Sequence, residues 1–307
     1  MQETFIKYIN YLEAEKNASP YTVRNYRNDL LDFFHFLKAE GVASLKEVNR
    51  HTLRDYMSYL MEQGIVKRSI ARKLSAIRSF YRYLIREGTI SASPVAATTS
   101  PKLDKRLPSF LTPEEIRKLL EAPDLTTPQG QRGRALLELL YASGLRVSEL
   151  VNLNLAHVNL DTREALVHGK GSKERVVLMG KPAADALSNY IRQGRTKLLD
   201  KKTGNALFIN RYGTRITERS IQRMLEEYTN KAGIDRRVHP HMLRHTFATH
   251  MLDGGADLRV VQELLGHADL SSTQIYTHVT KSRARKVYMS AHPLAREKSN
   301  EPDKQAE

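Results

Sequence analysis

Two stretches of this 307-residue chain place a basic side chain near glycine, where a phosphate group could approach the backbone. In SGLRVSEL at 143–150, Arg146 follows a glycine that would end a helix. A guanidinium group pairs with phosphate or carboxylate through parallel hydrogen bonds, and because Glu149 lies three residues on, an ordinary ion pair is the competing interpretation. In GKGSK at 169–173, Lys170 lies between glycines in a predicted hairpin turn. The spacing of a nucleotide-binding P-loop is missing, so binding of a nucleoside triphosphate gains no support.

A third stretch, HPHMLRHTFATH at 239–250, is rich in histidine. Pro240 suits the first position of a helix, which places His241 and Arg244 on one face of its first turn. A helix N-terminus favours anions. His241 also has a second histidine four residues on, as in zinc-binding H-E-x-x-H. However, Met242 replaces the glutamate and Arg244 would repel a cation, so the pattern argues against zinc.

A fourth stretch, LLGHADLSSTQIYTH at 264–278, predicts a helix that ends at Gly266 and leaves His267 at its edge. Tyr276 follows nine residues later in a polar segment, where a packing role is the alternative. Together the four stretches supply two arginines, two histidines, a lysine and a tyrosine. This is the set needed to attack a phosphodiester without a metal. The arginines would neutralise the phosphorane, the lysine would protonate the leaving oxygen, and the phenol would be the nucleophile.

The elements that must position these residues are mostly helices. Thr112 and Glu115 form a predicted capping box, and the pattern turns helical again from Pro182 onward. Alternating segments predict two strands joined by a turn, and a third possible strand precedes them. The predicted ranges are helix Gln131–Ala142, strands Glu164–Val167 and Glu174–Met179, turn His168–Lys173 and possible strand Leu155–Asn159. The C-terminal part is therefore expected to be α+β with one small antiparallel sheet.

The first hundred residues predict a bundle of four helices. The expected ranges are Thr4–Glu15, Tyr21–Lys38 with Ser19-Pro20 at its start, His51–Glu62 and Val66–Glu87. The fourth helix carries seven bases and no acid before its last residue, so it could follow a phosphate backbone or be simply solvated. The residues expected to contact a phosphate backbone are Lys67, Arg68, Arg72, Lys73 and Arg78.

Composition limits the classes of protein that remain. The net charge is +15, with a basic excess in both halves, which suggests a polyanion held between them and leaves a merely solvated basic surface as an equal alternative. The absence of cysteine excludes disulfides, thiolate nucleophiles and cysteine-ligated metals. Neither a signal peptide nor an apolar run of about 20 residues is present, so a cytoplasmic protein without a membrane span is expected. A proline-rich segment at 91–111 predicts a linker between two domains.

These motifs and their intervals resemble those of tyrosine recombinases of the Xer type, over nearly the whole chain. The resemblance rests on ASGLRVSEL at 142–150, HGKGSKERVV at 168–177, HPHMLRHTFATHML at 239–252 and LLGHADLSSTQIYTHV at 264–279. It implies a mainly α protein with a helical, SAM-like core-binding domain at 1–90 and the α+β tyrosine recombinase catalytic fold at 112–293. A disordered tail is expected at 294–307.

The resemblance also implies a role for each matching residue. Arg146 and Arg244 would clamp the scissile phosphate, and His267 would donate a further hydrogen bond to it. Lys170 would protonate the 5′-hydroxyl leaving group. His241 would accept the proton of the tyrosine or assist as an acid or base, and Tyr276 would form the 3′-phosphotyrosyl link. Glu149 matches an often acidic position that supports the site. ATP is not expected, because the tyrosyl ester keeps the energy of the broken bond. A metal ion is not expected either, because two arginines and a lysine would do the work of divalent ions.

The activity implied is site-specific recombination through a Holliday junction inside a tetramer. The short length favours resolution of chromosome dimers at a dif-like site during cell division over integration of a mobile element. A terminal helix at Lys281–Pro293, with Val287, Met289 and Ala291 as its apolar stripe, would dock into a neighbouring subunit. That neighbour is a second copy or a paralogous recombinase, and an FtsK-type DNA translocase is a further expected partner. A type IB topoisomerase and a catalytically silent DNA-binding protein are the remaining alternatives.

Overall fold

The computed structural model describes residues 2–16, 18–95, 110–169, 174–266 and 278–295. The chain divides into two compact units, Met1–Arg106 and Leu107–Glu307, which are described separately. Most of the predicted linker and most of the predicted tail lie outside the described residues. Within the described ranges, no helix is long and apolar enough to cross a membrane.

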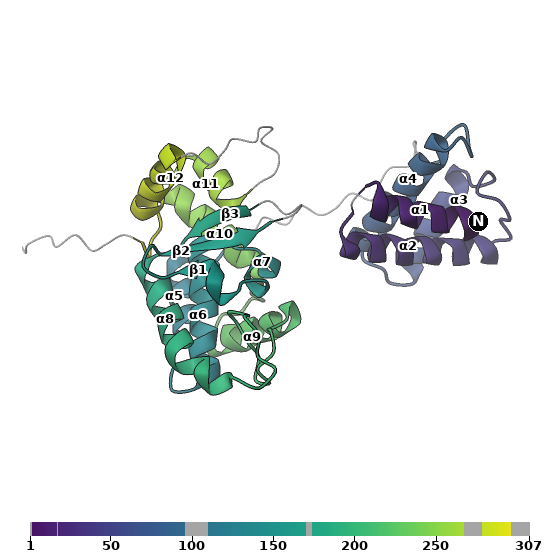
Figure 1. Ribbon diagram of the computed structural model, residues 1–307. Coiled ribbons are helices and arrows are strands. Elements are labelled where there is room, and N and C mark those ends of the chain that lie inside the picture. The colour runs from purple at the N-terminus through teal and green to yellow at the C-terminus, as the bar shows by residue number, and fades with distance from the viewer. Residues whose placement is uncertain (1, 17, 96–109, 170–173, 267–277, 296–307) are drawn as a thin grey trace, which may run out of the picture. The chain divides into compact units, whose positions relative to one another are not determined.

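The first unit is a bundle of four helices, as the sequence predicts (Figure 1). They are α1 (Gln2–Ala14), α2 (Pro20–Ala39), α3 (Arg50–Glu62) and α4 (Lys67–Arg86). Helix α2 begins as expected, because the Ser19 side chain accepts a hydrogen bond from the Thr22 N–H at 3.2 Å. Aromatic rings fill the core, and the Phe33 and Tyr56 centroids lie 5.0 Å apart. Packing of apolar faces therefore holds this unit together.

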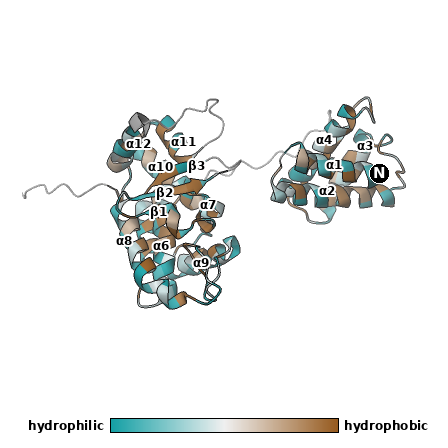
Figure 2. Ribbon diagram, in the orientation of Figure 1, coloured by the Kyte–Doolittle hydropathy of each residue, from teal (hydrophilic) through white to brown (hydrophobic). Residues whose placement is uncertain are grey.

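The second unit consists of helices around a small sheet (Figure 1). Its helices are α5 (Pro113–Glu121), α6 (Pro128–Ser143), α7 (Val147–Val151), α8 (Lys181–Asn189), α9 (Glu218–Lys231), α10 (Pro240–Asp253), α11 (Leu258–Leu265) and α12 (His278–Ala291). Its strands are β1 (Val158–Asn159), β2 (Glu164–His168) and β3 (Glu174–Leu178), antiparallel in the order β1-β2-β3. The hydrophobic residues of this sheet are brown in Figure 2. The predicted fold class, mainly α with one small antiparallel sheet, is confirmed.

Helix α6 lies at the centre of the second unit. Every residue from Ala135 to Leu145 is buried, and α6 packs against α5, α8 and α10. A helix that is apolar all round belongs inside a core. The helix starts at Pro128, three residues before the predicted start, because the Thr127 hydroxyl caps it by accepting from the Gly130 N–H at 3.0 Å. Its C-terminal end therefore lies in a fixed, solvent-free place.

The prediction of helix from Pro182 onward is wrong for residues 199–217. There the chain makes irregular turns, with isolated bridges pairing Ile209 with Arg215 and Asn154 with Ala206. Gly213 adopts a φ of +74°, which glycine tolerates and other residues resist. Local turn chemistry therefore overrides the helical pattern in this segment.

Helix α12 packs on α10 and α11 of its own unit. Its buried residues are Ala284, Tyr288 and Ala291, spaced four and three apart as one helical face requires. Val287 and Met289 of the predicted stripe are only partly buried. The predicted stripe is therefore confirmed at Ala291 and only partly at Val287 and Met289, because a spacing of two residues does not follow one face of a helix.

Candidate active site

Arg146 lies at the junction between α6 and α7. Gly144 ends α6 with a φ of +59°, and Arg146 then occupies the N-cap of α7. Glu149 reaches back from the third position of α7. Its Oε2 accepts from the Arg146 backbone N–H at 2.8 Å and its Oε1 from the Arg146 Nη1 at 2.8 Å. The predicted pairing of these two residues therefore exists, and it holds a half-buried guanidinium at the start of a helix.

Arg175 on β3 is a second partner of Glu149 and is absent from the predicted site. Its Nη1 and Nη2 donate to Glu149 Oε1 and Oε2 at 2.7 and 2.9 Å. Burial alone would raise the pKa of Glu149, but the hydrogen bonds from Arg175 and from the Arg146 backbone outweigh it and bring the pKa to about 2. Glu149 is therefore ionised at neutral pH and accepts hydrogen bonds from both arginines.

Arg244 fastens the ends of two helices. Its Nη1 donates to the Gly144 carbonyl at 2.7 Å and its Nη2 to the Leu265 carbonyl at 2.6 Å, the C-terminal ends of α6 and α11. Burial, followed by the nearby charge of Arg146, lowers the pKa of Arg244 to about 10. The guanidinium therefore stays protonated at neutral pH, and its two bonds to backbone carbonyls leave its positive charge uncancelled.

Glycine at 144 permits this close approach. A Cβ there would lie 2.6 Å from Phe247 Cδ1 and 2.8 Å from Leu265 Cδ2. Phe247 and Leu265 are themselves buried, so neither can move aside without disturbing the core. The positive φ and the lack of space both require glycine next to the carbonyl that Arg244 binds.

His241 lies on the first turn of α10, one turn before Arg244. Pro240 occupies the first helical position as predicted, and the His239 Nδ1 caps the helix by accepting from the Met242 N–H at 3.1 Å. Burial, with a contribution from His241, lowers the pKa of His239. His241 is exposed. Among the described residues, no group of three or more His, Asp or Glu side chains could hold a metal ion.

Lys170, His267 and Tyr276 lie outside the described residues. The described residues beside them are nevertheless informative. Gly266, which precedes His267, ends α11 with a φ of +65°, and its carbonyl lies 3.5 Å from Arg146 Nη2. The structure thus brings together Arg146, Glu149, Arg244 and the residue before His267.

In the first unit, acidic side chains of α2 face the basic side of α4. Arg72 pairs with Asp29, and Lys73 is 7% exposed and pairs with both Asp29 and Asp32. Lys73 therefore presents no free ammonium to solvent. Among the other predicted DNA contacts, Lys67 and Arg68 are exposed and Arg78 is half-buried. The acids lie about 40 residues away in sequence, so the pattern within α4 could not reveal them.

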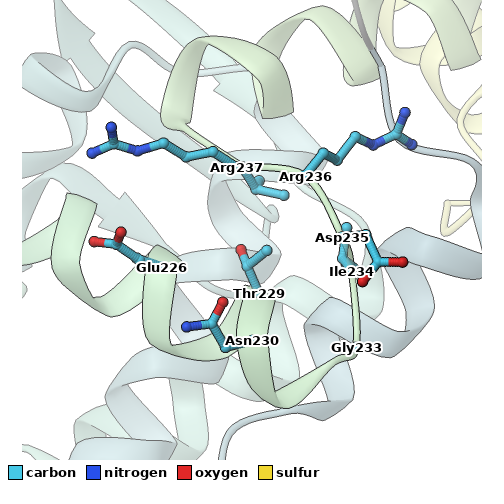
Figure 3. Close-up of a pocket in the computed structure, with 9 residues that line it drawn as sticks. Glu226, Thr229, Asn230, Gly233, Ile234, Asp235, Arg236 and Arg237 are labelled. Atoms are coloured by element: carbon cyan, nitrogen blue, oxygen red, sulfur yellow. The ribbon is translucent and has the colours of Figure 1, made fainter.

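A separate cavity of about 380 Å³ lies between the end of α9 and the segment that leads into α10 (Figure 3). It is lined by Glu226, Thr229, Asn230 and residues 233–238. Arg236, on its rim, pairs with Glu115 of α5. None of the predicted site residues lines this cavity, so it adds nothing to the site formed by the arginines.

Comparisons of sequence and of fold with known proteins agree with the resemblance to tyrosine recombinases. Residues 109–283 match the phage integrase family, and residues 5–88 match the phage integrase N-terminal SAM-like domain. The chain is 50% identical to tyrosine recombinase XerC of Oceanobacillus iheyensis, over 94% of this chain and 95% of that protein. It is 45% identical to XerC of Bacillus subtilis, over 97% and 99%. It is 42% identical to tyrosine recombinase XerD of Staphylococcus haemolyticus, over 95% and 100%.

A solved structure of the XerH site-specific recombinase bound to a palindromic difH substrate, a post-cleavage complex, has a similar fold. The TM-score is 0.69 at 27% identity, over 89% of this chain and 81% of that one. The chain therefore belongs to the phage integrase family. Within that family it is a Xer-type tyrosine recombinase, an enzyme of site-specific recombination that cleaves and rejoins DNA strands.

Proposed function

We propose that this recombinase resolves chromosome dimers at a dif-like site during cell division, through a 3′-phosphotyrosyl intermediate and a Holliday junction. The observation that carries the chemistry is the pair of arginines at the end of α6. Arg146 is held through Glu149, and Arg244 is held by the Gly144 and Leu265 carbonyls. Two fixed positive charges at one place suit a phosphate that gains negative charge in the transition state.

In the proposed reaction, the Tyr276 oxygen attacks the scissile phosphorus while His241 accepts the phenolic proton. The bond from phosphorus to the 5′-oxygen breaks, and Lys170 supplies the proton that the leaving 5′-hydroxyl needs. Arg146, Arg244 and His267 stabilise the charged intermediate. A 5′-hydroxyl from the partner strand then attacks the tyrosyl ester and gives its proton to Lys170. The bond from phosphorus to the Tyr276 oxygen breaks, and the phenol takes back its proton from His241.

The two units have separate proposed tasks. Residues 1–90 bind duplex DNA, with Lys67, Arg68 and Arg78 on the backbone, and 91–111 link them to the catalytic domain at 112–293. Arg72 and Lys73, which pair with acids of α2, are the remaining proposed contacts. The exposed positions of Lys67 and Arg68 support this assignment.

The proposed assembly is a tetramer on DNA, of this chain alone or with a paralogous recombinase. Similarity to proteins named XerC and to one named XerD supports a paralogous partner. The C-terminal helix would join neighbouring subunits, the tail at 294–307 would lie beyond it, and an FtsK-type translocase would regulate the assembly. Neither a metal ion nor ATP takes part in the proposed chemistry.

The first test uses nicked duplexes with random central sequences. The protein is incubated with the library, denatured with SDS and examined for a covalent DNA adduct. We expect an adduct with the wild type and none with Tyr276→Phe, which should bind DNA equally well. A recovered sequence that occurs once in the host chromosome would support a dif-like site, whereas the ends of a mobile element would support an integrase. An adduct that survives in Tyr276→Phe would exclude this nucleophile.

A further inference from the structure

We infer that Arg175 is a positioning residue of this recombinase, which fixes the guanidinium of Arg146 by holding both oxygens of Glu149. The inference rests on the function proposed for Arg146 above. Arg175 lies on β3, whereas Glu149 and Arg146 lie at the start of α7. The pair therefore ties the hairpin that carries the Lys170 turn to the segment that carries the phosphate clamp.

The geometry of the pair is that of a rigid connection. Arg175 and Glu149 form two parallel hydrogen bonds of 2.7 and 2.9 Å, and their side chains are 9% and 3% exposed. Each oxygen of Glu149 is shared, since Oε1 also accepts from Arg146 Nη1 and Oε2 from the Arg146 N–H. A fork with two donors fixes the plane of a carboxylate, which the single ammonium of a lysine cannot do. The orientation of Arg146 thus depends on Arg175.

Arg175 also contacts the end of α11. A Cβ on Gly266 would lie 2.9 Å from Arg175 Cδ and 3.1 Å from its Nε, so the arginine lies directly against this glycine. The Gly266 carbonyl in turn lies 3.5 Å from Arg146 Nη2. One side chain therefore contacts both α7 and the residue before His267.

Removal of Arg175 should change how Glu149 responds to pH. The charged groups that face this carboxylate are Arg146 from α7, Arg175 from β3 and, at longer range, Arg244 from α10. Burial favours the neutral acid, and hydrogen bonds from Arg175 oppose it. Without Arg175, Glu149 should therefore take up a proton at higher pH and release Arg146.

The test compares the wild type with Arg175 variants in single-turnover cleavage of a nicked duplex. The core of this duplex is the sequence recovered from wild-type adducts. We expect Arg175→Met to lower the cleavage rate about 100-fold and Arg175→Lys about tenfold, with DNA affinity within about threefold of wild type. The matched control is Arg195→Met. Arg195 is equally buried but donates to the Gly204 and Ala206 carbonyls, so its loss should cost stability and leave cleavage by folded protein within about threefold.

A pH profile separates positioning from a general loss of structure. Arg175→Met should lose cleavage as the pH falls from 8 to 5, more steeply than wild type, and adding Glu149→Gln should remove that extra dependence. Wild-type rates and an unchanged profile in Arg175→Met would overturn the inference, as would an equal loss in Arg195→Met. If the proposed function is wrong, the wild type itself will form no adduct. That outcome would also overturn the inference about Arg175.

Discussion

Substitution of Gly144 by alanine should damage the second unit more than its backbone conformation alone explains. The left-handed conformation costs a residue with a side chain about 1–2 kcal/mol. A Cβ at 144 would also lie 2.6 Å from the buried Phe247 ring, and overpacking of a core costs about 1–3 kcal/mol. We therefore expect Gly144→Ala to lower the free energy of unfolding by about 2–5 kcal/mol.

Gly233 supplies the matched control. It has a φ of +65°, but nothing lies within 4 Å of the place where a Cβ would be. Gly233→Ala should therefore lose only about 1–2 kcal/mol, the cost of the conformation. Native-state hydrogen exchange of peptides from α6 and α10, measured by mass spectrometry on the intact chain, would give both values. Equal losses in the two variants would refute the argument from close packing at Gly144.

Two further predictions concern titration and DNA affinity. Burial lowers the pKa of His292 to about 3. The unfolded chain therefore binds a proton at His292 near pH 6.5, whereas the folded chain does not. The free energy of unfolding should therefore fall as the pH drops from 7.5 to 5. In urea titrations, His292→Phe should show a weaker dependence of this free energy on pH than the wild type. An identical dependence on pH in both proteins would contradict this. Arg68→Ala should weaken DNA binding and reduce the slope of log K against log salt concentration by about one. Lys73→Met should mainly destabilise the first unit, because Lys73 is buried beside Asp29. Filter binding at several salt concentrations would test this, and equal salt slopes for both variants would argue against it.

Local features of the fold could be predicted because their causes lie close together in sequence. The capping box is one example, since the Thr112 N–H donates to Glu115 Oε2 at 2.8 Å and the Glu115 N–H to Thr112 Oγ1 at 3.2 Å. The start of α10 at Pro240 and the hairpin of β2 and β3 are others. In each case a few neighbouring residues determine the structure.

The connections inside the candidate site could not be predicted in this way. Arg244 binds carbonyls 100 and 21 residues away, and Arg175 binds Glu149 across 26 residues. Backbone carbonyls carry no sequence signal, because every residue has one. The four motifs predicted which residues belong to the site, but only the fold shows what holds Arg146 and Arg244 in place.

The same connections concentrate positive charge at the candidate site. Three guanidinium groups, those of Arg146, Arg175 and Arg244, gather around the carboxylate of Glu149, and Arg146 already lowers the pKa of Arg244. Mutual repulsion of these charges lowers the free energy of unfolding, a cost that functional sites commonly carry. In the function proposed above a bound phosphate offsets this repulsion, so DNA is expected to act on the second unit as a stabilising ligand as well as a substrate. The second unit should therefore be least stable without DNA and gain stability as the DNA backbone binds at these arginines.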